Sequence, residues 1–270
     1  MSAAPLPPVL LVGCGKMGGA LLSGWLERGL SRAVVVEPHT ASTAAFAGRV
    51  LVAPEAEDIP YDFAPAAVVL ATKPQQAEAA LPTYARYAQG GAVVVSIMAG
   101  KTISAMEGLL GGAAVVRAMP NTPAAIGQGF TVACAGRRVS ADQKALADRL
   151  LSATGEVAWV DAESLIDPVT AISGGGPAYV FLLAELLEKA ALEQGLPPDL
   201  ARRMARATVS GSGALLSRSE EDVAVLRKNV TSPKGTTEQA LAVLMAKDAW
   251  PRLVSEAIDA ATKRSRELAG

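Results

Sequence analysis

The 270-residue sequence has little histidine and little cysteine, and each shortage excludes a class of site. The single histidine, His39, excludes a metal site built from several histidines and leaves a Ser-His-Asp triad possible only through His39 itself. The two cysteines, Cys14 and Cys134, lie far apart without a C-x-x-C pair, which excludes a disulfide framework and a zinc finger. We therefore expect no bound metal.

Charge is also scarce and balanced. Charged residues make up 19% of the chain, with 25 basic and 26 acidic side chains and no basic block, so we expect no nucleic-acid partner. Mean hydropathy is high at +0.29, but the longest uncharged runs, 118–136 and 168–184, hold prolines and glycines unsuited to a spanning helix. The first residues do not resemble a signal peptide. These features predict a cytoplasmic protein without a membrane partner.

The order of apolar runs predicts the fold class. Short continuous runs alternate with helical patterns up to about Asp161, as in a parallel sheet buried on both faces, and only helical patterns follow. We predict an α/β chain in which a Rossmann-type dinucleotide-binding domain, 1–162, precedes an all-helical domain, 163–270. The predicted strands are 9–12, 33–36, 50–52, 67–71, 92–96, 115–118, 130–135 and 157–160. The predicted helices include 75–87, 177–194, 198–216, 233–247 and 250–268, with a capping box at 217–220 before a further helix.

A glycine motif lies between the first predicted strand and the first predicted helix. Gly13, Gly15 and Gly18 form G-x-G-x-x-G, in which the first glycine permits a tight turn, the second lets a pyrophosphate approach and the third packs helix against strand. In this context the motif predicts dinucleotide binding, and the alternative is a purely structural turn. Glu37 ends the second predicted strand, where a carboxylate can accept hydrogen bonds from ribose hydroxyls and repel a 2′-phosphate; otherwise it is a solvated loop residue.

Further candidate residues lie after later strands, where ligands bind in open α/β sheets. Lys73 follows the fourth strand, Ala99 follows the fifth, and Asn121 lies between Pro120 and Pro123, which fix its backbone. A solvated lysine and a structural turn are the plainer readings of Lys73 and Asn121. The polar stretch 229–237 precedes a helix whose first N–H groups could bind a small carboxylate, or form an ordinary helix cap.

These segments, in this order, resemble the pyrroline-5-carboxylate reductase family. The resemblance covers nearly the whole chain and rests on segments 13–18, 73–74, 119–123, 173–179 and 231–237. It implies reduction of 1-pyrroline-5-carboxylate to L-proline by NADPH or NADH, the last step of proline biosynthesis. It also implies a homodimer built through the helical domain, with larger rings of dimers.

The resemblance also implies roles for individual residues. The cofactor residues are Gly13, Gly15, Lys16, Met17, Gly18, Ala71, Lys73, Pro74, Ala99 and Asn229, to which the residue patterns above add Glu37 and Asn121. The substrate residues are Glu163, Asn229, Ser232, Gly235, Thr236 and Thr237. We expect the Thr237 hydroxyl to hydrogen-bond the imine nitrogen, and the N–H groups of 235–237, with Ser232, to hold the carboxylate.

Two departures from the family pattern stand out. Lys234 occupies the place of the first glycine of the usual glycine pair, and Glu37 lies where many relatives have a small or basic phosphate-binding stretch. Because Glu37 would repel a 2′-phosphate, we expect NADH to be favoured.

Two other functions fit part of the sequence. A β-hydroxyacid dehydrogenase would need a catalytic lysine in the helical domain, where Lys189 and Lys228 are the candidates. A non-enzymatic dinucleotide sensor would keep the glycine motif but would not need segment 231–237.

Overall fold

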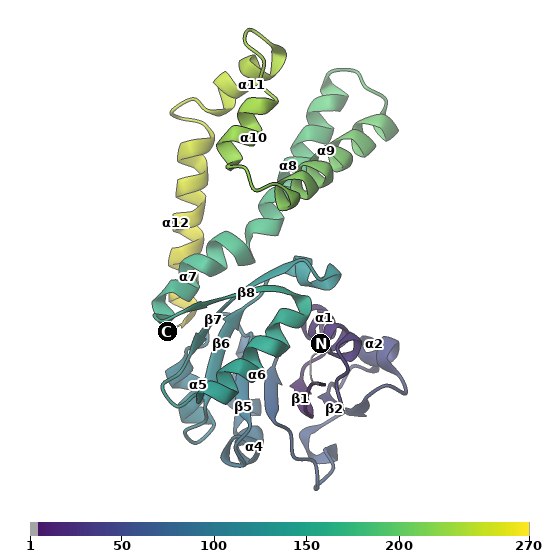
Figure 1. The fold of residues 1–270 in the computed structure, drawn as a ribbon, viewed down its shortest axis with the longest axis vertical. Helices are drawn as coiled ribbons and strands as arrows, with labels where there is room; N and C mark the ends of the chain where they lie inside the picture. The colour runs from purple at the N-terminus through teal and green to yellow at the C-terminus, as the bar shows by residue number, and fades with distance from the viewer. Residues whose placement is uncertain (1–4, 270) are drawn as a thin grey trace. The chain divides into compact units, whose positions relative to one another are not determined.

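A computed structural model describes residues 5–269, which form two compact units (Figure 1). The first unit takes in the described residues up to 174 together with those from 261 onward, and the second covers 175–260. The units thus divide after the boundary predicted between 162 and 163. The reason is packing. Ile166, Asp167 and Ala171 are buried, and Ile166 belongs to a hydrophobic cluster that contains strand residues of the sheet, so this segment joins the first unit.

An eight-stranded sheet with the order β3-β2-β1-β4-β5-β6-β7-β8 forms the first unit. Strands β1 to β6 are all parallel, β7 is antiparallel to β6, and β8 is parallel to β7. The predicted Rossmann-type α/β fold is thereby confirmed. The strands are β1 (Val9–Val12), β2 (Ala33–Val36), β3 (Leu51–Ala53), β4 (Ala67–Leu70), β5 (Val93–Ser96), β6 (Val115–Met119), β7 (Gly129–Ala135) and β8 (Gly155–Val160).

The strands read as unbroken apolar runs because both faces of the sheet are covered. In β1, Leu10 and Val12 point into one hydrophobic cluster while Val9 and Leu11 point into the other. Helices α1 (Lys16–Glu27) and α6 (Ala141–Leu151) contribute to the second cluster, and Trp25 Nε1 joins them by donating to the Leu150 carbonyl at 2.8 Å. Helices α4 (Ala85–Gln89), α5 (Ile103–Leu109) and α7 (Ile166–Val169) contribute to the first cluster.

The single helix predicted over 75–87 is wrong. That segment folds as 3₁₀ turns at 74–76 and 81–84 alternating with the short helices α3 (Ala77–Ala80) and α4. Pro82 lies inside the segment, and proline removes a backbone donor and disfavours helix in the residue before it. The helix α2 (Thr40–Thr43) is equally short.

The second unit is all-helical, as predicted. Its helices are α8 (Gly176–Glu193), α9 (Pro198–Arg218), α10 (Val223–Asn229), α11 (Thr236–Leu244) and the first part of α12 (Trp250–Ala269). The capping box predicted at 217–220 is wrong, because α10 begins at Val223 and its N-terminal cap is Asp222, whose carboxylate accepts from the Ala224 N–H at 2.7 Å. The Ser217 hydroxyl instead bonds within α9.

The second unit leaves most of its large apolar side chains exposed. Among its described residues, the buried apolar side chains are those of Ala191, Ala201 and Ala205, whereas Phe181 is 64% exposed and Val243 is 71% exposed. The helical stretch 163–193 is, by length and composition alone, apolar enough to cross a membrane, and only 6% of its most apolar window is buried. Exposed apolar surface of this extent is typical of an interaction site.

Candidate functional site

The predicted cofactor residues of the first unit come together at one edge of the sheet. Because β1, β2, β4, β5 and β6 are parallel, their carboxyl ends share an edge, and the predicted residues lie just beyond those ends. The strand order reverses between β1 and β4, which is where an open α/β sheet binds a ligand. These residues are Gly13, Gly15, Lys16, Met17 and Gly18 after β1, Glu37 after β2, Ala71, Lys73 and Pro74 after β4, Ala99 after β5 and Asn121 after β6.

The glycine turn fits a dinucleotide. Gly13 has φ of 91°, and a Cβ there would lie 2.8 Å from the Ala71 carbonyl oxygen, so the turn packs directly on the end of β4. A Cβ on Gly18 would collide with the Gly13 carbonyl oxygen. A Cβ on Gly15 would meet no described atom within 4 Å, and no side chain caps the start of α1. The start of this helix therefore has both the room and the N–H groups for a phosphate.

Glu37 is buried and is held in place by the glycine turn itself. Its Oε2 accepts from the Cys14 N–H at 2.8 Å and its Oε1 accepts from the His39 N–H at 2.9 Å, and the residue is 7% exposed. Burial and the Glu37 charge raise the pKa of the Cys14 thiol to about 11. Cys14 is therefore a neutral thiol at physiological pH, and the two hydrogen bonds fix the Glu37 carboxyl group at the end of β2.

Asn121 is occupied by protein partners. Its Oδ1 accepts from the Phe130 N–H at 2.8 Å, and its Nδ2 donates to the Ser173 hydroxyl at 3.2 Å. The side chain thus ties the segment after β6 to β7 and to the stretch before α8. A cofactor contact by Asn121 stays a prediction.

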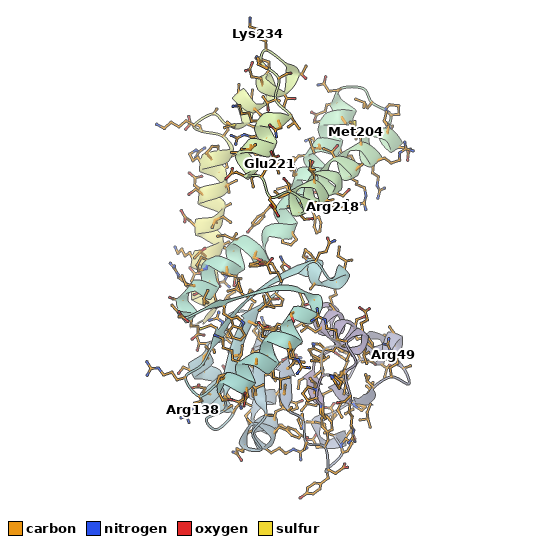
Figure 2. The ribbon with its side chains drawn as sticks, viewed as in Figure 1. Arg49, Arg138, Met204, Arg218, Glu221 and Lys234 are labelled. Atoms are coloured by element: carbon orange, nitrogen blue, oxygen red, sulfur yellow. The ribbon has the colours of Figure 1, made fainter. Side chains whose placement is uncertain are left out.

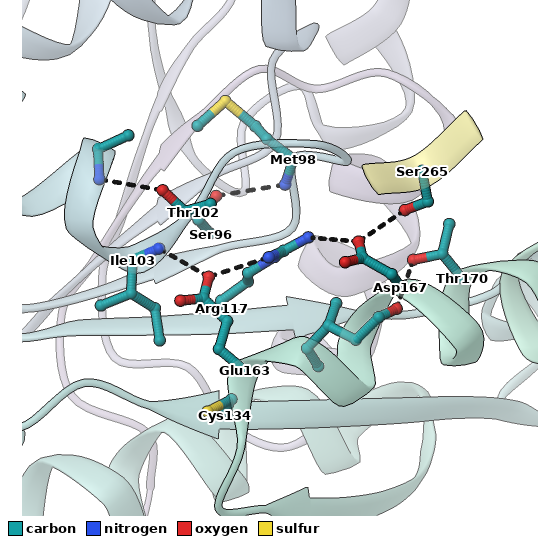
Figure 3. Close-up of polar contacts among 12 residues, drawn as sticks. Ser96, Met98, Thr102, Ile103, Arg117, Cys134, Glu163, Asp167, Thr170 and Ser265 are labelled. Atoms are coloured by element: carbon teal, nitrogen blue, oxygen red, sulfur yellow. Dashed lines mark hydrogen bonds and ion pairs between the residues drawn. The ribbon is translucent and has the colours of Figure 1, made fainter. Parts of the chain in front are cut away.

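Glu163 belongs to a buried network of charged side chains (Figure 3). Its Oε1 accepts from Arg117 Nη1 at 2.9 Å and from the Ile103 N–H at 2.8 Å. Arg117 Nη2 lies 3.6 Å from Asp167 Oδ1, which accepts from the Ser265 hydroxyl at 2.8 Å. Val160, the last residue of β8, lies in register with Cys134, Arg117 and Ser96, so Glu163 lies near the carboxyl end of β5, beside the start of α5. Its substrate role stays a prediction.

Sequence reasoning missed the central member of this network. Arg117 lies in the middle of β6, between the buried Val116 and Ala118, and its side chain is 2% exposed. A single arginine inside an apolar strand is a signal that could have been found, since a buried charge requires a partner. Its partners could not be read from the sequence, because Glu163 lies 46 residues away.

The predicted substrate residues Asn229, Ser232, Gly235, Thr236 and Thr237 belong to the second unit, at the end of α10 and the start of α11. The Gly235 N–H donates to the Ser232 carbonyl at 3.0 Å, so the predicted carboxylate contact rests on the N–H groups of Thr236 and Thr237. Asn229 Nδ2 donates to Glu221 Oε2 at 3.4 Å. Thr237 is half-buried in the first turn of α11.

Lys234 has a left-handed backbone with φ of 60°, its N–H donates to Glu238 Oε2 at 2.8 Å, and its side chain projects from the tip of the loop (Figure 2). A position with left-handed backbone geometry favours glycine, and the family pattern has glycine at this place.

We expect Lys234→Gly to raise the free energy of unfolding by about 1 kcal/mol, measured by urea denaturation. Lys247→Gly, which also removes an exposed lysine from a loop, is the control; a loss of stability in Lys234→Gly would contradict the expectation.

Comparisons with known proteins match both parts of the chain. Residues 163–268 match the family described as pyrroline-5-carboxylate reductase dimerisation, and residues 8–100 match the family described as NADP oxidoreductase coenzyme F420-dependent. The pyrroline-5-carboxylate reductase of Pseudomonas aeruginosa is 38% identical over 97% of each chain. The chain belongs to the pyrroline-5-carboxylate reductase family.

Solved structures of pyrroline-5-carboxylate reductases have the same fold. The enzyme from Coxiella burnetii is 32% identical and superposes with a TM-score of 0.89 over 98% of this chain and 99% of its own. The Plasmodium falciparum enzyme, solved with NADP bound, is 26% identical with a TM-score of 0.84 over 99% of this chain and 100% of its own. The resemblance inferred from the sequence is confirmed over the whole length of the chain.

Proposed function

We propose that the chain reduces 1-pyrroline-5-carboxylate to L-proline, the reaction that its relatives' names imply. The cofactor NAD(P)H supplies a hydride to the imine carbon, and the ring nitrogen takes up a proton. The observation that carries the proposal is the whole-length match to this family, joined to a glycine turn that fits a dinucleotide.

A single assay tests the proposed reaction: loss of NAD(P)H absorbance on adding pyrroline-5-carboxylate, with proline as product. Oxidation of hydroxyacids without this activity would favour the dehydrogenase alternative.

The chain's own residues bind and orient the reactants in this proposal. Gly13, Gly15 and Gly18, with the start of α1, would hold the pyrophosphate. The Thr236 and Thr237 N–H groups would hold the substrate carboxylate, and the Thr237 hydroxyl would hydrogen-bond the imine nitrogen. A protonated imine is already electrophilic, so orientation is the main contribution required of the protein. Among residues 5–269, no cluster of three or more His, Cys, Asp or Glu side chains could hold a metal.

We infer that the chain favours NADH over NADPH, although its N-terminal match is to an NADP oxidoreductase family. The buried Glu37 carboxylate is fixed at the end of β2 by two backbone N–H groups, so its charge cannot swing away from a 2′-phosphate. Charge-assisted hydrogen bonds from the free ribose hydroxyls would favour NADH by roughly 1–3 kcal/mol.

Glu37→Ser is expected to shift the cofactor preference toward NADPH by roughly 5- to 100-fold, read as the ratio of the two KM values. The shift should come mostly from a lower KM for NADPH, and the ratio corrects for any effect of the freed Cys14 and His39 N–H groups that both cofactors share. Glu27→Ser, which removes an exposed carboxylate from the end of α1, should leave the ratio unchanged. A strong NADPH preference that is identical in wild type and Glu37→Ser would show that Glu37 does not read the ribose.

We propose that the chain is a homodimer, joined through the helical unit, that can assemble into a ring of dimers in the cytoplasm. The exposed apolar side chains of α8 and α9 support a protein partner, and residues 163–268 match a dimerisation family. The same partner would cover the apolar stretch 163–193, so we propose that no membrane is involved.

Gly211 and Gly213 give a test of this assembly. A Cβ on either glycine would meet no described atom within 4 Å, which favours a close approach between subunits over a helix crossing within one chain. We therefore expect Gly211→Leu to weaken the dimer, so that the mass in light scattering falls toward that of one chain at micromolar concentration. Ser210→Leu, one position earlier on α9, is the control. A wild-type monomer under these conditions would overturn the proposal of a dimer.

A further inference from the structure

The end of α12 packs directly on the loop between β5 and α5, residues 97–102. Gly100 in this loop has φ of 71°, and a Cβ there would lie 2.9 Å from the Leu268 carbonyl oxygen and 3.0 Å from its Cβ. The backbone of the loop therefore touches the last turn of the helix, with no side chain between them. Ala99, a predicted cofactor residue, is the neighbour of Gly100 and is exposed.

The same turn of α12 also reaches the far end of this loop through the buried network (Figure 3). Ser265, 7% exposed, donates to Asp167 at 2.8 Å, and Asp167 pairs with Arg117. Arg117 in turn holds Glu163, whose carboxylate accepts from the N–H of Ile103, the first residue of α5. The loop is thus fixed at Gly100 by direct contact and at Ile103 through a chain of ion pairs and hydrogen bonds around the buried Arg117.

We propose that the last two turns of α12, residues 262–268, position the β5–α5 loop for the nicotinamide cofactor, with Ser265 as the positioning residue. The inference rests on the proposed function, because it takes Ala99 as a cofactor contact. A loop held in its binding conformation before the ligand arrives loses less conformational entropy on binding, and this raises affinity. Arg117 carries the effect, since its guanidinium lies 2.9 Å from Glu163 and 3.6 Å from Asp167.

The test is the affinity of the folded protein for NADH and NADPH, measured by calorimetry without substrate. Ser265→Ala removes the hydroxyl that holds Asp167 and is expected to raise the dissociation constant of the preferred cofactor about 3- to 30-fold. Ser265→Thr keeps the hydroxyl and should restore most of the affinity. Arg264→Ala is the matched control, because it removes an exposed ion pair with Glu267 from the same turn and should leave the affinity unchanged.

A purely structural role for Ser265 would lower the melting temperature and leave the dissociation constant at its wild-type value, and that result would overturn the proposal. If Ser265→Ala does not fold, Leu268→Gly decides, since it removes the Cβ that lies against Gly100 and keeps Ser265 in place. An unchanged dissociation constant in folded Leu268→Gly would overturn the proposal in that case. A wild type that binds the cofactor but does not reduce pyrroline-5-carboxylate would refute the proposed function and leave this inference standing.

Discussion

Thr237→Ala is expected to lower kcat/KM for pyrroline-5-carboxylate by roughly 10- to 1,000-fold, the range for losing one transition-state hydrogen bond or one proton-relay group. Thr237 is half-buried in the first turn of α11, where its hydroxyl and its N–H group belong to the same predicted substrate loop. Steady-state kinetics at saturating cofactor measure the effect. The KM of the cofactor should change little, because the residue is assigned to the substrate.

Two neighbouring variants make this test specific. Thr237→Ser keeps the hydroxyl and should keep most of the activity. Thr236→Ala removes the adjacent, exposed hydroxyl but keeps the backbone N–H assigned to the carboxylate, so its effect should be small. Wild-type turnover in Thr237→Ala would remove this hydroxyl from the mechanism, and equal losses in both alanine variants would point to the helix start rather than to Thr237.

Arg117→Met is expected to have the largest effect on stability. It keeps the length and apolar stem of the side chain but leaves Asp167, whose side chain is 11% exposed, without its cation. Breaking a buried ion pair by removing one partner costs about 3–5 kcal/mol, because the other charge remains buried. Urea denaturation at a fixed chain concentration measures the loss, since the stability of a dimer depends on concentration.

An exposed pair on α9 supplies the comparison. Arg203 lies 3.6 Å from Asp199, and the two side chains are 73% and 84% exposed. Arg203→Met should therefore change the free energy of unfolding by less than about 1 kcal/mol. If Arg117→Met also costs less than about 1 kcal/mol, the network contributes little to stability, and the Glu163 carboxylate does not depend on it.

Most of the sheet could be predicted from the sequence, because its central strands β1, β2, β4 and β5 are buried on both faces and appear as apolar runs. The predicted strand 33–36 matches β2, and the predicted run 67–71 exceeds β4 by one residue. Helix 75–87 was predicted wrongly, since its apolar spacing is helical but Pro82 divides it. The capping box at 217–220 was predicted wrongly because Asp222, which directly precedes the first residue of α10, caps the helix instead.

The site was predictable in part for a related reason. The glycine turn is local, so its spacing and its place after β1 are visible in the sequence. Arg117, Asp167 and Ser265 meet only through tertiary packing, since 98 residues separate Asp167 from Ser265. No local pattern encodes such a contact. The antiparallel direction of β7 is likewise set by how the chain returns to the sheet and not by the composition of the strand.

The return of α12 to the first unit has a consequence for synthesis on the ribosome. Residues up to 174 emerge first, yet Asp167 lacks the Ser265 hydroxyl, and Gly100 lacks Leu268, until the helical unit 175–260 has been made. At usual rates of translation this interval is on the order of ten seconds. During that time the first unit holds the Asp167 carboxylate without the Ser265 hydroxyl. Its last step of folding must therefore follow the synthesis of residues 261–268.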